Sequence, residues 1–263
     1  MIKFCSLFSG SSGNCIFVGT DNAKILIDAG VSGAKIATAL QEIGENPQDL
    51  SAIFVTHEHS DHIASVGILS RRYNVPIFAT EKTWDAMGKA PGKILPENKR
   101  FLNSGCELSL GDLQVKNFTV SHDAEDPVAY TFTCGDKKVS VATDMGYVSD
   151  QVRENVMGSN LILLESNHDE GMLKAGPYPY YLKQRILGKQ GHLSNIAAAD
   201  FLGELILNGT ERVFLGHLSQ ENNTPECAFE TARDILLERD LKVGRDFDMW
   251  VAERKNYSEV ITL

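Results

Sequence analysis

The chain has 263 residues, of which 43% are hydrophobic and 23% are charged, so it is long enough for one large domain or two small ones. These fractions are ordinary for a globular protein and exclude a wholly disordered, collagen-like or coiled-coil chain. The 35 acidic side chains outnumber the 25 basic ones, which gives a formal net charge of −10. This balance argues against a protein that coats nucleic acid or anionic membrane by bulk charge, although it leaves room for a local basic groove.

The cysteines and apolar runs indicate the compartment. There are five cysteines, an odd number, and none lie in a C-x-x-C pair, so neither a disulfide framework nor a cysteine zinc site is expected. The first residues lack the apolar segment of a signal peptide, and apolar runs such as Leu161–Leu164 are too short to span a bilayer. We therefore expect a cytoplasmic protein with no membrane partner.

The first half of the chain predicts mostly strands. Short apolar runs between Gly, Ser, Asn and Asp turn signals predict strands, and apolar side chains at helical spacing predict helices. In chain order we expect strands at 3–8, 15–19 and 24–28, a helix at 31–43, a strand at 52–55, a helix at 63–73, a strand at 77–79, and a strand-rich block at 108–142 with strands at 113–120, 128–133 and 139–142.

The second half of the chain predicts more helix. We expect a strand at 161–165, helices at 180–187 and 195–207, a strand at 212–215, a helix at 225–239, and strands at 249–252 and 259–263. Two halves that each run from strands into helices favour an α/β (α+β) protein in which two sheets pack face to face with helices outside. No linker rich in Pro or Gly divides the halves, so we expect a single domain over residues 1–263.

One motif dominates the candidate chemistry. The run His57-Glu58-His59-Ser60-Asp61-His62 holds three of the seven histidines and follows the apolar strand expected at 52–55. Imidazole and carboxylate groups are good ligands for divalent cations, and a loop that leaves a buried strand holds them at fixed spacing. The motif is not H-E-x-x-H, because Asp61 stands where the second histidine would be. A metal site explains this density better than a solvated polar loop does.

Further His and Asp residues follow other expected strands. Asp28, His122, Asp144 and His217 each come directly after or within two residues of an apolar run. Any one of them alone is equally well explained as a turn residue or a hydrogen-bonded histidine. Together they indicate that several strands deliver His or Asp from the same sheet edge, which would assemble a metal cage from residues distant in sequence.

In this order, Asp28, the H-x-H-x-D-H run, His122, Asp144 and His217 resemble the five motifs of the metallo-β-lactamase fold over nearly the whole chain. The resemblance implies a four-layer αβ/βα sandwich with a two-metal site at one edge of the paired sheets. SGSSGN near the start, ESNHD, GHLSN and HLSQENN further along look like the YycJ/WalJ-like subgroup, which implies a 5′-to-3′ exodeoxyribonuclease. More distant relatives with similar motifs are the tRNase Z-type and PhnP-type phosphodiesterases.

The same resemblance implies a ligand set. One metal would be held by His57, His59 and His122, a second by Asp61, His62 and His217, with Asp144 as the bridge. Asp28 resembles the buried aspartate that orients the ligand loop without binding metal, although a plain turn aspartate before Gly30 is the alternative. The expected cofactors are two divalent ions, Zn²⁺ or Mn²⁺ with Fe²⁺ also possible, because all three accept His/Asp cages.

Such a pair of cations predicts hydrolysis. Two metals lower the pKa of a shared water from about 15.7 toward about 7 and neutralise the charge that builds up on a phosphodiester. Asp61 is a candidate to orient or deprotonate the water. His192 in GHLSN and Glu165 in ESNHD are candidates to assist the leaving group, as a His and a Glu do in tRNase Z-like relatives.

Four residues are weaker candidates for substrate binding. Ser11, Ser12 and Asn14 lie in a Gly/Ser loop whose backbone N–H groups could face a phosphate, although such a loop is more often only a hairpin turn. His168 could bind phosphate, hold a carboxylate or cap a loop. The segment GKAPGKI is not a Walker loop, because its spacing is short and Ile replaces Ser or Thr, so ATP-driven chemistry is not expected.

Basic residues gather in two parts of the chain. One set lies between Arg71 and Arg100; the other, Lys174, Lys183, Arg185 and Lys189, is interleaved with tyrosines between ESNHD and GHLSN. Arg and Lys beside aromatic residues are typical of strand-binding grooves, so we expect nucleic acid as substrate, DNA before RNA. The alternatives are an RNase or small cyclic phosphodiesterase, a thioester hydrolase on the same fold, and a binding protein with a vestigial metal site.

Overall fold

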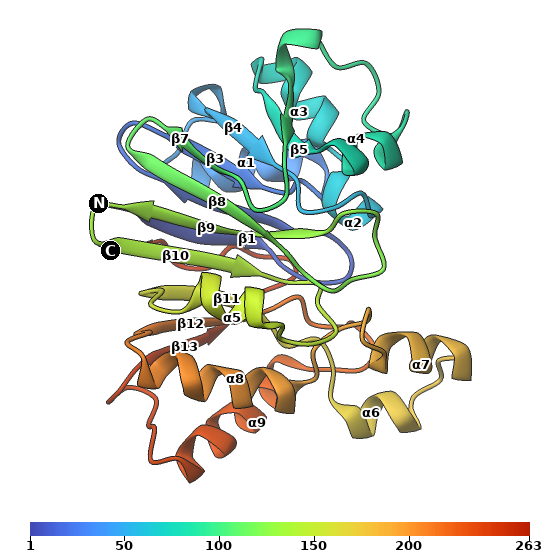
Figure 1. The fold of residues 1–263 in the computed structure, drawn as a ribbon, viewed down its shortest axis with the longest axis vertical. Helices are drawn as coiled ribbons and strands as arrows, with labels where there is room; N and C mark the ends of the chain where they lie inside the picture. Colours follow the sequence, from blue (N-terminus) through green and yellow to red (C-terminus); the bar gives the residue numbers. More distant parts are fainter.

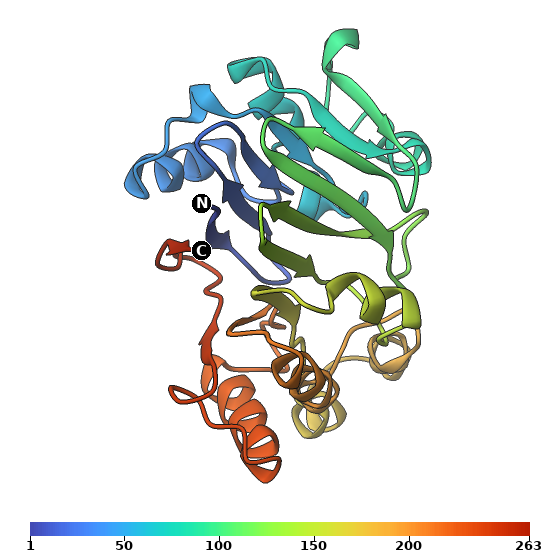
Figure 2. The same cartoon turned by 60° about the vertical axis from the view of Figure 1, so that its left-hand side comes forward.

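Two seven-stranded sheets lie face to face in the computed structural model of residues 1–263, and helices cover the outer face of each sheet (Figures 1 and 2). This is the αβ/βα arrangement expected from the sequence. The first sheet has the order β14-β1-β2-β3-β4-β5-β6, with β1 (Lys3–Phe8), β2 (Cys15–Gly19), β3 (Lys24–Ile27), β4 (Ala52–Phe54), β5 (Ile77–Thr80), β6 (Lys99–Leu102) and β14 (Ile261–Thr262). The second has the order β13-β12-β11-β10-β9-β8-β7, with β7 (Glu107–Leu110), β8 (Leu113–Thr119), β9 (Val128–Cys134), β10 (Lys137–Ala142), β11 (Leu161–Glu165), β12 (Arg212–Gly216) and β13 (Asp248–Val251).

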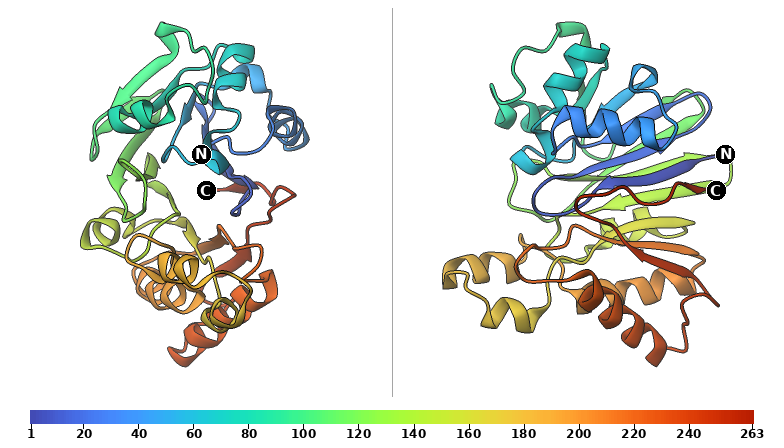
Figure 3. Two further views of the ribbon diagram at one scale, coloured as in Figure 1. Left: turned by 90° about the vertical axis from the view of Figure 1, so that its right-hand side faces the viewer. Right: turned by 180° about the vertical axis from the view of Figure 1, so that it is seen from behind.

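The helices fall into three groups. The first sheet is covered by α1 (Gly33–Glu42), α2 (Ser60–Ile63), α3 (Val66–Tyr73) and α4 (Glu81–Met87). The second is covered by α5 (Asp150–Val156), α8 (Asn195–Leu207) and α9 (Pro225–Glu238). The remaining pair, α6 (Glu170–Ala175) and α7 (Tyr180–Leu187), projects beyond the sheets at the end of the molecule opposite the chain termini (Figures 1 and 3). No helix is both long and apolar enough to cross a membrane.

Aromatic side chains fill the space between the sheets. Phe54 on β4 packs against Tyr130 on β9, with ring centroids 5.4 Å apart, and both side chains are fully buried. Burial of one such side chain contributes about 1.5–3 kcal/mol. The Tyr130 hydroxyl also donates a hydrogen bond to the Val55 carbonyl, 2.7 Å away. This contact fixes the end of β4, where the histidine-rich loop begins, to the opposite sheet.

The strand directions bring the polar motifs to one edge. β3 to β6 run parallel to one another, as do β10 to β13, and β8 runs parallel to β10 because both are antiparallel to β9. The loops after β3, β4, β8, β10 and β12 therefore leave the sheets at the same edge. These are the loops that carry Asp28, the 57–62 run, His122, Asp144 and His217.

Most expected elements match the structure within one or two residues, but not all. The helix expected at 63–73 is wrong, because the chain breaks at Ala64–Ser65 into α2 and α3. The strand expected at 259–263 shrinks to β14. The sequence analysis missed α4, α5, α6 and β6, which are short and expose much of their surface, so their apolar periodicity is weak.

Candidate metal centre and active site

Three histidines from two loops converge at the edge of the sheets. His57 and His59 follow β4, and His122 follows β8. The Nε2 atom of His57 lies 3.0 Å from the Nδ1 atom of His59, and the ring centroid of His122 lies 5.0 Å from that of His57. One nitrogen from each ring lies within 4.8 Å of the other two, so the three can share one cation.

A second group lies beside the first. Asp61, His62 and His217 also bring one potential ligand atom each within 4.8 Å of one another. Asp144 lies between the groups: its Oδ2 is 3.5 Å from His62 Nε2, while its Oδ1 is 3.4 Å from His217 Nε2 and 3.8 Å from His122 Nε2. A carboxylate in this place can reach two cations at once. The structure thus brings together all seven residues expected as ligands.

The backbone of this region is conformationally unusual. Only five non-glycine residues have a positive φ, and three of them are Asp28 (60°), Asp144 (58°) and His217 (55°). Each directly follows a strand or lies two residues beyond it, where the left-handed conformation turns the side chain out of the sheet and toward the cluster. This conformation is rare outside glycine and carries an energetic cost, and such strain concentrates at functional sites.

In three buried histidines of the cluster, the ring nitrogen that points away from the cluster, Nδ1, is hydrogen-bonded to another group. His62 Nδ1 donates to Asp28 Oδ2 at 2.7 Å, and His122 Nδ1 donates to the Gly191 carbonyl at 3.2 Å. His217 Nδ1 donates to Glu165 Oε1 at 3.0 Å. In all three rings Nε2 is left to face the cluster. This is the usual arrangement around metal-binding histidines, where the outer partner fixes the tautomer and ring orientation.

Asp28 and Thr56 organise the loop that carries the first histidines. Asp28 Oδ1 accepts from the Thr56 backbone N–H at 2.8 Å, and Asp28 Oδ2 accepts from the Thr56 hydroxyl at 2.9 Å. Thr56 Oγ1 lies 2.9 Å from His57 Nδ1, which can donate to it and so leave His57 Nε2 free. Asp28 thus holds both His57 and His62 without facing the cation positions.

Glu165 occupies the corresponding place on the second sheet. Its side chain is fully buried, and Oε1 lies 2.7 Å from His192 Nδ1 as well as 3.0 Å from His217 Nδ1. Oε2 accepts from the backbone N–H groups of Met145 and Leu193. Four contacts leave no room for substrate at this carboxylate. Glu165 therefore acts through the two histidines it orients.

The two histidine groups differ in electrostatics. Burial, together with the neighbouring imidazoles of His62 and His122, lowers the pKa of His57 well below its ordinary value. Burial also lowers the pKa of His122. Both side chains are therefore neutral at pH 7, and neutral imidazole is the form that binds a metal.

Carboxylates control the second group. Burial alone would lower the pKa of His62, but Asp144 and Asp28 raise it well above the ordinary value. Burial is likewise outweighed at His217, where Asp144 and Asp61 raise the pKa to about 10. In return, the imidazoles hold the pKa of Asp144 below its usual range against the effect of burial. Protons on the imidazoles of His62 and His217 thus supply positive charge that a bound cation would otherwise supply.

These observations fit a divalent metal centre. Asp144 Oδ2 and His217 Nε2 are buried and lack hydrogen-bond partners, although both face the cluster. No lysine or arginine pairs with Asp28, Asp144 or Glu165, whose ion-pair partners are histidines alone. Buried carboxylates need compensating charge, and His/Asp donor sets suit divalent ions. The residues present therefore fit a cofactor of two divalent cations.

A cavity of about 170 Å³ adjoins this centre. His192 and Asp123 line it, and each also contacts the cluster: His192 Nδ1 lies 3.8 Å from Asp144 Oδ1, and Asp123 Oδ1 lies 3.3 Å from His122 Nε2. Tyr178 and residues of α7 form the opposite wall. We call this space the His192 cavity.

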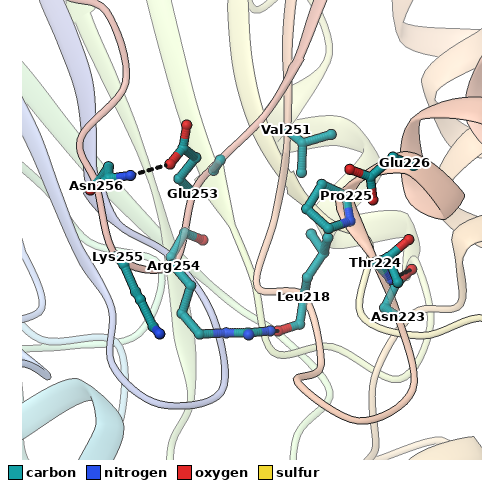
Figure 4. A pocket seen from close by; sticks show the side chains of 12 residues that line it. Leu218, Asn223, Thr224, Pro225, Glu226, Val251, Glu253, Arg254, Lys255 and Asn256 are labelled. Atoms are coloured by element: carbon teal, nitrogen blue, oxygen red, sulfur yellow. Dashed lines mark hydrogen bonds between the residues drawn. The ribbon is translucent and has the colours of Figure 1, made fainter.

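A larger cavity, of about 550 Å³, lies elsewhere (Figure 4). Its lining mixes Glu226 and Glu253 with Arg254 and Lys255, and the Arg254 guanidinium donates to the Leu218 carbonyl at 3.1 Å. It contains none of the expected ligands. Size alone therefore does not mark the reactive site, and the smaller cavity beside His192 is the better candidate.

The residues expected to bind substrate are placed differently from one another. Ser11 is exposed and lines the His192 cavity, whereas Ser12 is exposed outside it. Asn14 is buried; its Oδ1 accepts from Gly10 N at 2.9 Å and its Nδ2 lies 3.2 Å from His62 Nε2, so it positions the loop. His168 is 1% exposed, away from the cavity, with both ring nitrogens unpartnered.

Several residues that position the expected ligands were not predicted from the sequence. Thr56 is one; Ser9, whose hydroxyl accepts from the His217 backbone N–H at 2.8 Å, is another. Asn167 Nδ2 donates to the His217 carbonyl at 2.9 Å. Asp123 pairs with Arg185 on α7. Thr56 and Asp123 each adjoin a predicted ligand, while Ser9 and Asn167 lie in the SGSSGN and ESNHD segments; these positions are the sequence signals that could have marked them.

Known proteins resemble this chain in sequence and in structure. "Exodeoxyribonuclease WalJ" of Streptococcus pneumoniae is 45% identical over 250 residues, 94% of this chain and 93% of that protein. "Exodeoxyribonuclease YycJ" of Bacillus anthracis is 42% identical over 248 residues, 94% of each. Among solved structures, the metallo-beta-lactamase fold protein YhfI of Bacillus subtilis superposes with a TM-score of 0.73 at 15% identity, over 98% of this chain and 100% of that one.

The family model for the metallo-beta-lactamase superfamily matches residues 9–217, a span that begins in the loop after β1 and ends at the His217 of the metal centre. The fold, the two nearly full-length relatives and the match of this model agree with the resemblance drawn from the motifs. The chain therefore belongs to the metallo-beta-lactamase superfamily.

Proposed function

We propose that this protein is a metal-dependent phosphodiesterase that removes nucleotides from the 5′ ends of DNA. The observation that carries the proposal is the identity of 42–45% to two exodeoxyribonucleases over nearly the whole chain. The complete set of His and Asp ligands supports a hydrolase with an intact centre. We place the reaction in the cytoplasm, where the five free cysteines would stay reduced.

In this proposal two divalent cations are held as the sequence analysis expects. His57, His59 and His122 would hold one, Asp61, His62 and His217 would hold the other, and Asp144, which lies between the two groups, would be a ligand to both. Zn²⁺ and Mn²⁺ are the ions we propose, because both accept imidazole and carboxylate ligands. When bound, the ions supply Lewis acidity that makes water a nucleophile at neutral pH and neutralises charge on the phosphodiester.

The side chains around the centre supply the proton transfers. Asp61 is 24% exposed on its side chain and lies beside both His62 and His217, so it can orient the attacking water and accept its proton. His192 is 20% exposed and faces the cavity, so it can give a proton to the departing alkoxide. Glu165, fully buried, holds His192 through Nδ1 and leaves Nε2 for that transfer.

A polarity-resolved nuclease assay tests this function. Protein loaded with Mn²⁺ or Zn²⁺ is given single- or double-stranded DNA that carries a radiolabel at the 5′ or the 3′ end. We expect the 5′ label to be released first and the 3′-labelled strand to shorten progressively, and His59→Ala to abolish both. A matched RNA strand and a thioester serve as competing substrates. Release from the 3′ end first, or hydrolysis of the thioester alone, would contradict the proposal.

A further inference from the structure

We propose that the His192 cavity receives the base of the 5′-terminal nucleoside of a single-stranded DNA end, the nucleoside that leaves in each cycle. The inference rests on the proposed exonuclease function and adds to it the part of the substrate that this cavity recognises. It makes Tyr178 and Leu182 binding residues for the terminal base. The cavity supports this assignment by its size, by the residues that line it, by the contacts that fix α7 beside it, and by the position of His192 in its lining.

The lining of the cavity combines apolar and polar side chains. Tyr178, Leu182 and Ile186 form the apolar side, and Ser11, Asn167 and Ser219 supply hydroxyl and amide groups on other parts of the wall. A base has two apolar faces and a polar edge, so it needs this combination. Stacking on an aromatic ring tolerates any base, which suits an enzyme that must digest every sequence.

The apolar side chains of α7 have no role in the core. α7 contains no buried residue, and neither Leu182 nor Ile186 belongs to any of the three hydrophobic clusters. The segment from 170 to 191 carries four basic side chains and one acidic one in a chain whose net charge is −10. Its helices project beyond the two sheets (Figures 1 and 3). We call the segment from 170 to 191 the arm; its apolar and basic side chains are of the kinds that bind a nucleic-acid strand.

The arm is fixed to the metal centre and not loosely attached. Arg185 on α7 pairs with Asp123, directly after the ligand His122. Further along, the Lys189 carbonyl accepts from the Ser121 hydroxyl at 2.7 Å, and the Gly191 carbonyl accepts from His122 Nδ1 at 3.2 Å. Three contacts to residues 121–123 hold the far wall in register with the cation ligands. The cavity is therefore preformed at a set distance from the reacting phosphate.

The volume limits the occupant to one base. Drug-sized ligands occupy cavities of about 300–1,000 Å³. At about 170 Å³ the His192 cavity has roughly half of that lower limit, enough for a single ring system but not for two stacked bases. The expected products are accordingly mononucleotides.

The position of His192 assigns the terminal nucleoside to this cavity. In a hydrolysis that leaves a 5′-phosphate on the shortened strand, the water oxygen bonds to phosphorus and the bond from phosphorus to the 3′-oxygen of the departing nucleotide breaks. That 3′-oxygen must take up a proton. His192 lines the cavity and is held by Glu165, so a nucleoside seated there presents its 3′-oxygen to the imidazole.

The test compares two variants on two DNA ends. Leu182→Trp fills the cavity, and Tyr178→Ala removes the stacking ring; neither position is in the core, and metal content together with the melting temperature checks the fold. The substrates are a single strand with a normal 5′ nucleotide and one whose 5′-terminal residue is abasic. Tyr257→Ala, a half-exposed tyrosine outside the His192 cavity, is the matched control.

For the wild type and Tyr257→Ala, we expect kcat/KM to be about tenfold higher on the normal end than on the abasic end. For Tyr178→Ala and Leu182→Trp the ratio should fall to near one, with the loss on the normal end seen mainly in KM. A ratio near one in the wild type, or a tenfold ratio kept in both variants, overturns the cavity assignment while the exonuclease function stands. Absence of any release from 5′ ends by the wild type overturns both.

Discussion

Replacement of Asp144 by alanine is expected to abolish hydrolysis of DNA, with a loss of about 10³-fold or more in kcat/KM. This carboxylate is 3% exposed and lies within 3.8 Å of His62, His122 and His217, so in the proposed centre its removal would take a ligand from both cations. Metal content should fall with activity. Elemental analysis after removal of free ions, beside the rate on bis-p-nitrophenyl phosphate, measures both.

The matched control for that variant is Asp136→Ala. Asp136 lies in the turn between β9 and β10, at the other end of the strand from Asp144, and its side chain is 87% exposed. This substitution should leave the metal content and the rate unchanged. If Asp144→Ala retained the metal content and the rate of Asp136→Ala, the assignment of Asp144 to the centre would be wrong.

Replacement of His192 by alanine is expected to lower kcat on DNA by about 10²–10⁴-fold while the metal content stays at the wild-type level. His192 lies close to Asp144 and His217, but its Nδ1 is held by Glu165 and its side chain is 20% exposed. A group that protonates the leaving alkoxide matters most when that alkoxide is a poor leaving group.

A comparison of two substrates with different leaving groups tests whether His192 donates the proton. The nucleoside 3′-alkoxide needs a proton, whereas p-nitrophenolate leaves readily without one. The loss caused by His192→Ala should therefore be much larger on DNA than on bis-p-nitrophenyl phosphate. Equal losses on the two substrates, or a loss of bound metal, would show instead that His192 is a ligand or a purely structural residue.

The clustering of the expected ligand residues could be predicted because His and Asp are concentrated at a few places in the chain. Three histidines within residues 57–62 are hard to explain except as part of a metal site. Asp28, Asp144 and His217 each follow an apolar run because the strands that carry them end at one edge of the sheets. The alternation of strands and helices predicted two facing sheets with helices outside, and the four-layer fold came from the resemblance that the motifs carry. Strand ends are visible in sequence because a buried strand is apolar and stops where polar side chains begin.

The supporting contacts could not be predicted, since they depend on how distant loops meet. Glu165 looked like a catalytic carboxylate, yet the structure buries it among backbone N–H groups and two imidazoles, which only tertiary packing decides. The position of α7 beside the cavity could not be predicted either, because it depends on the ion pair between Arg185 on α7 and Asp123. The break between α2 and α3 was missed because the apolar spacing continues through Ser65.

The proposed function requires that these side chains hold two cations and that Asp144 contacts both. Anomalous diffraction from a crystal grown with Mn²⁺ tests it most directly, because the ions themselves are located. We predict two peaks about 3.5–4 Å apart, one among His57, His59 and His122 and the other among Asp61, His62 and His217, with a carboxylate oxygen of Asp144 on each. A single peak, or peaks that Asp144 does not contact, would contradict the account.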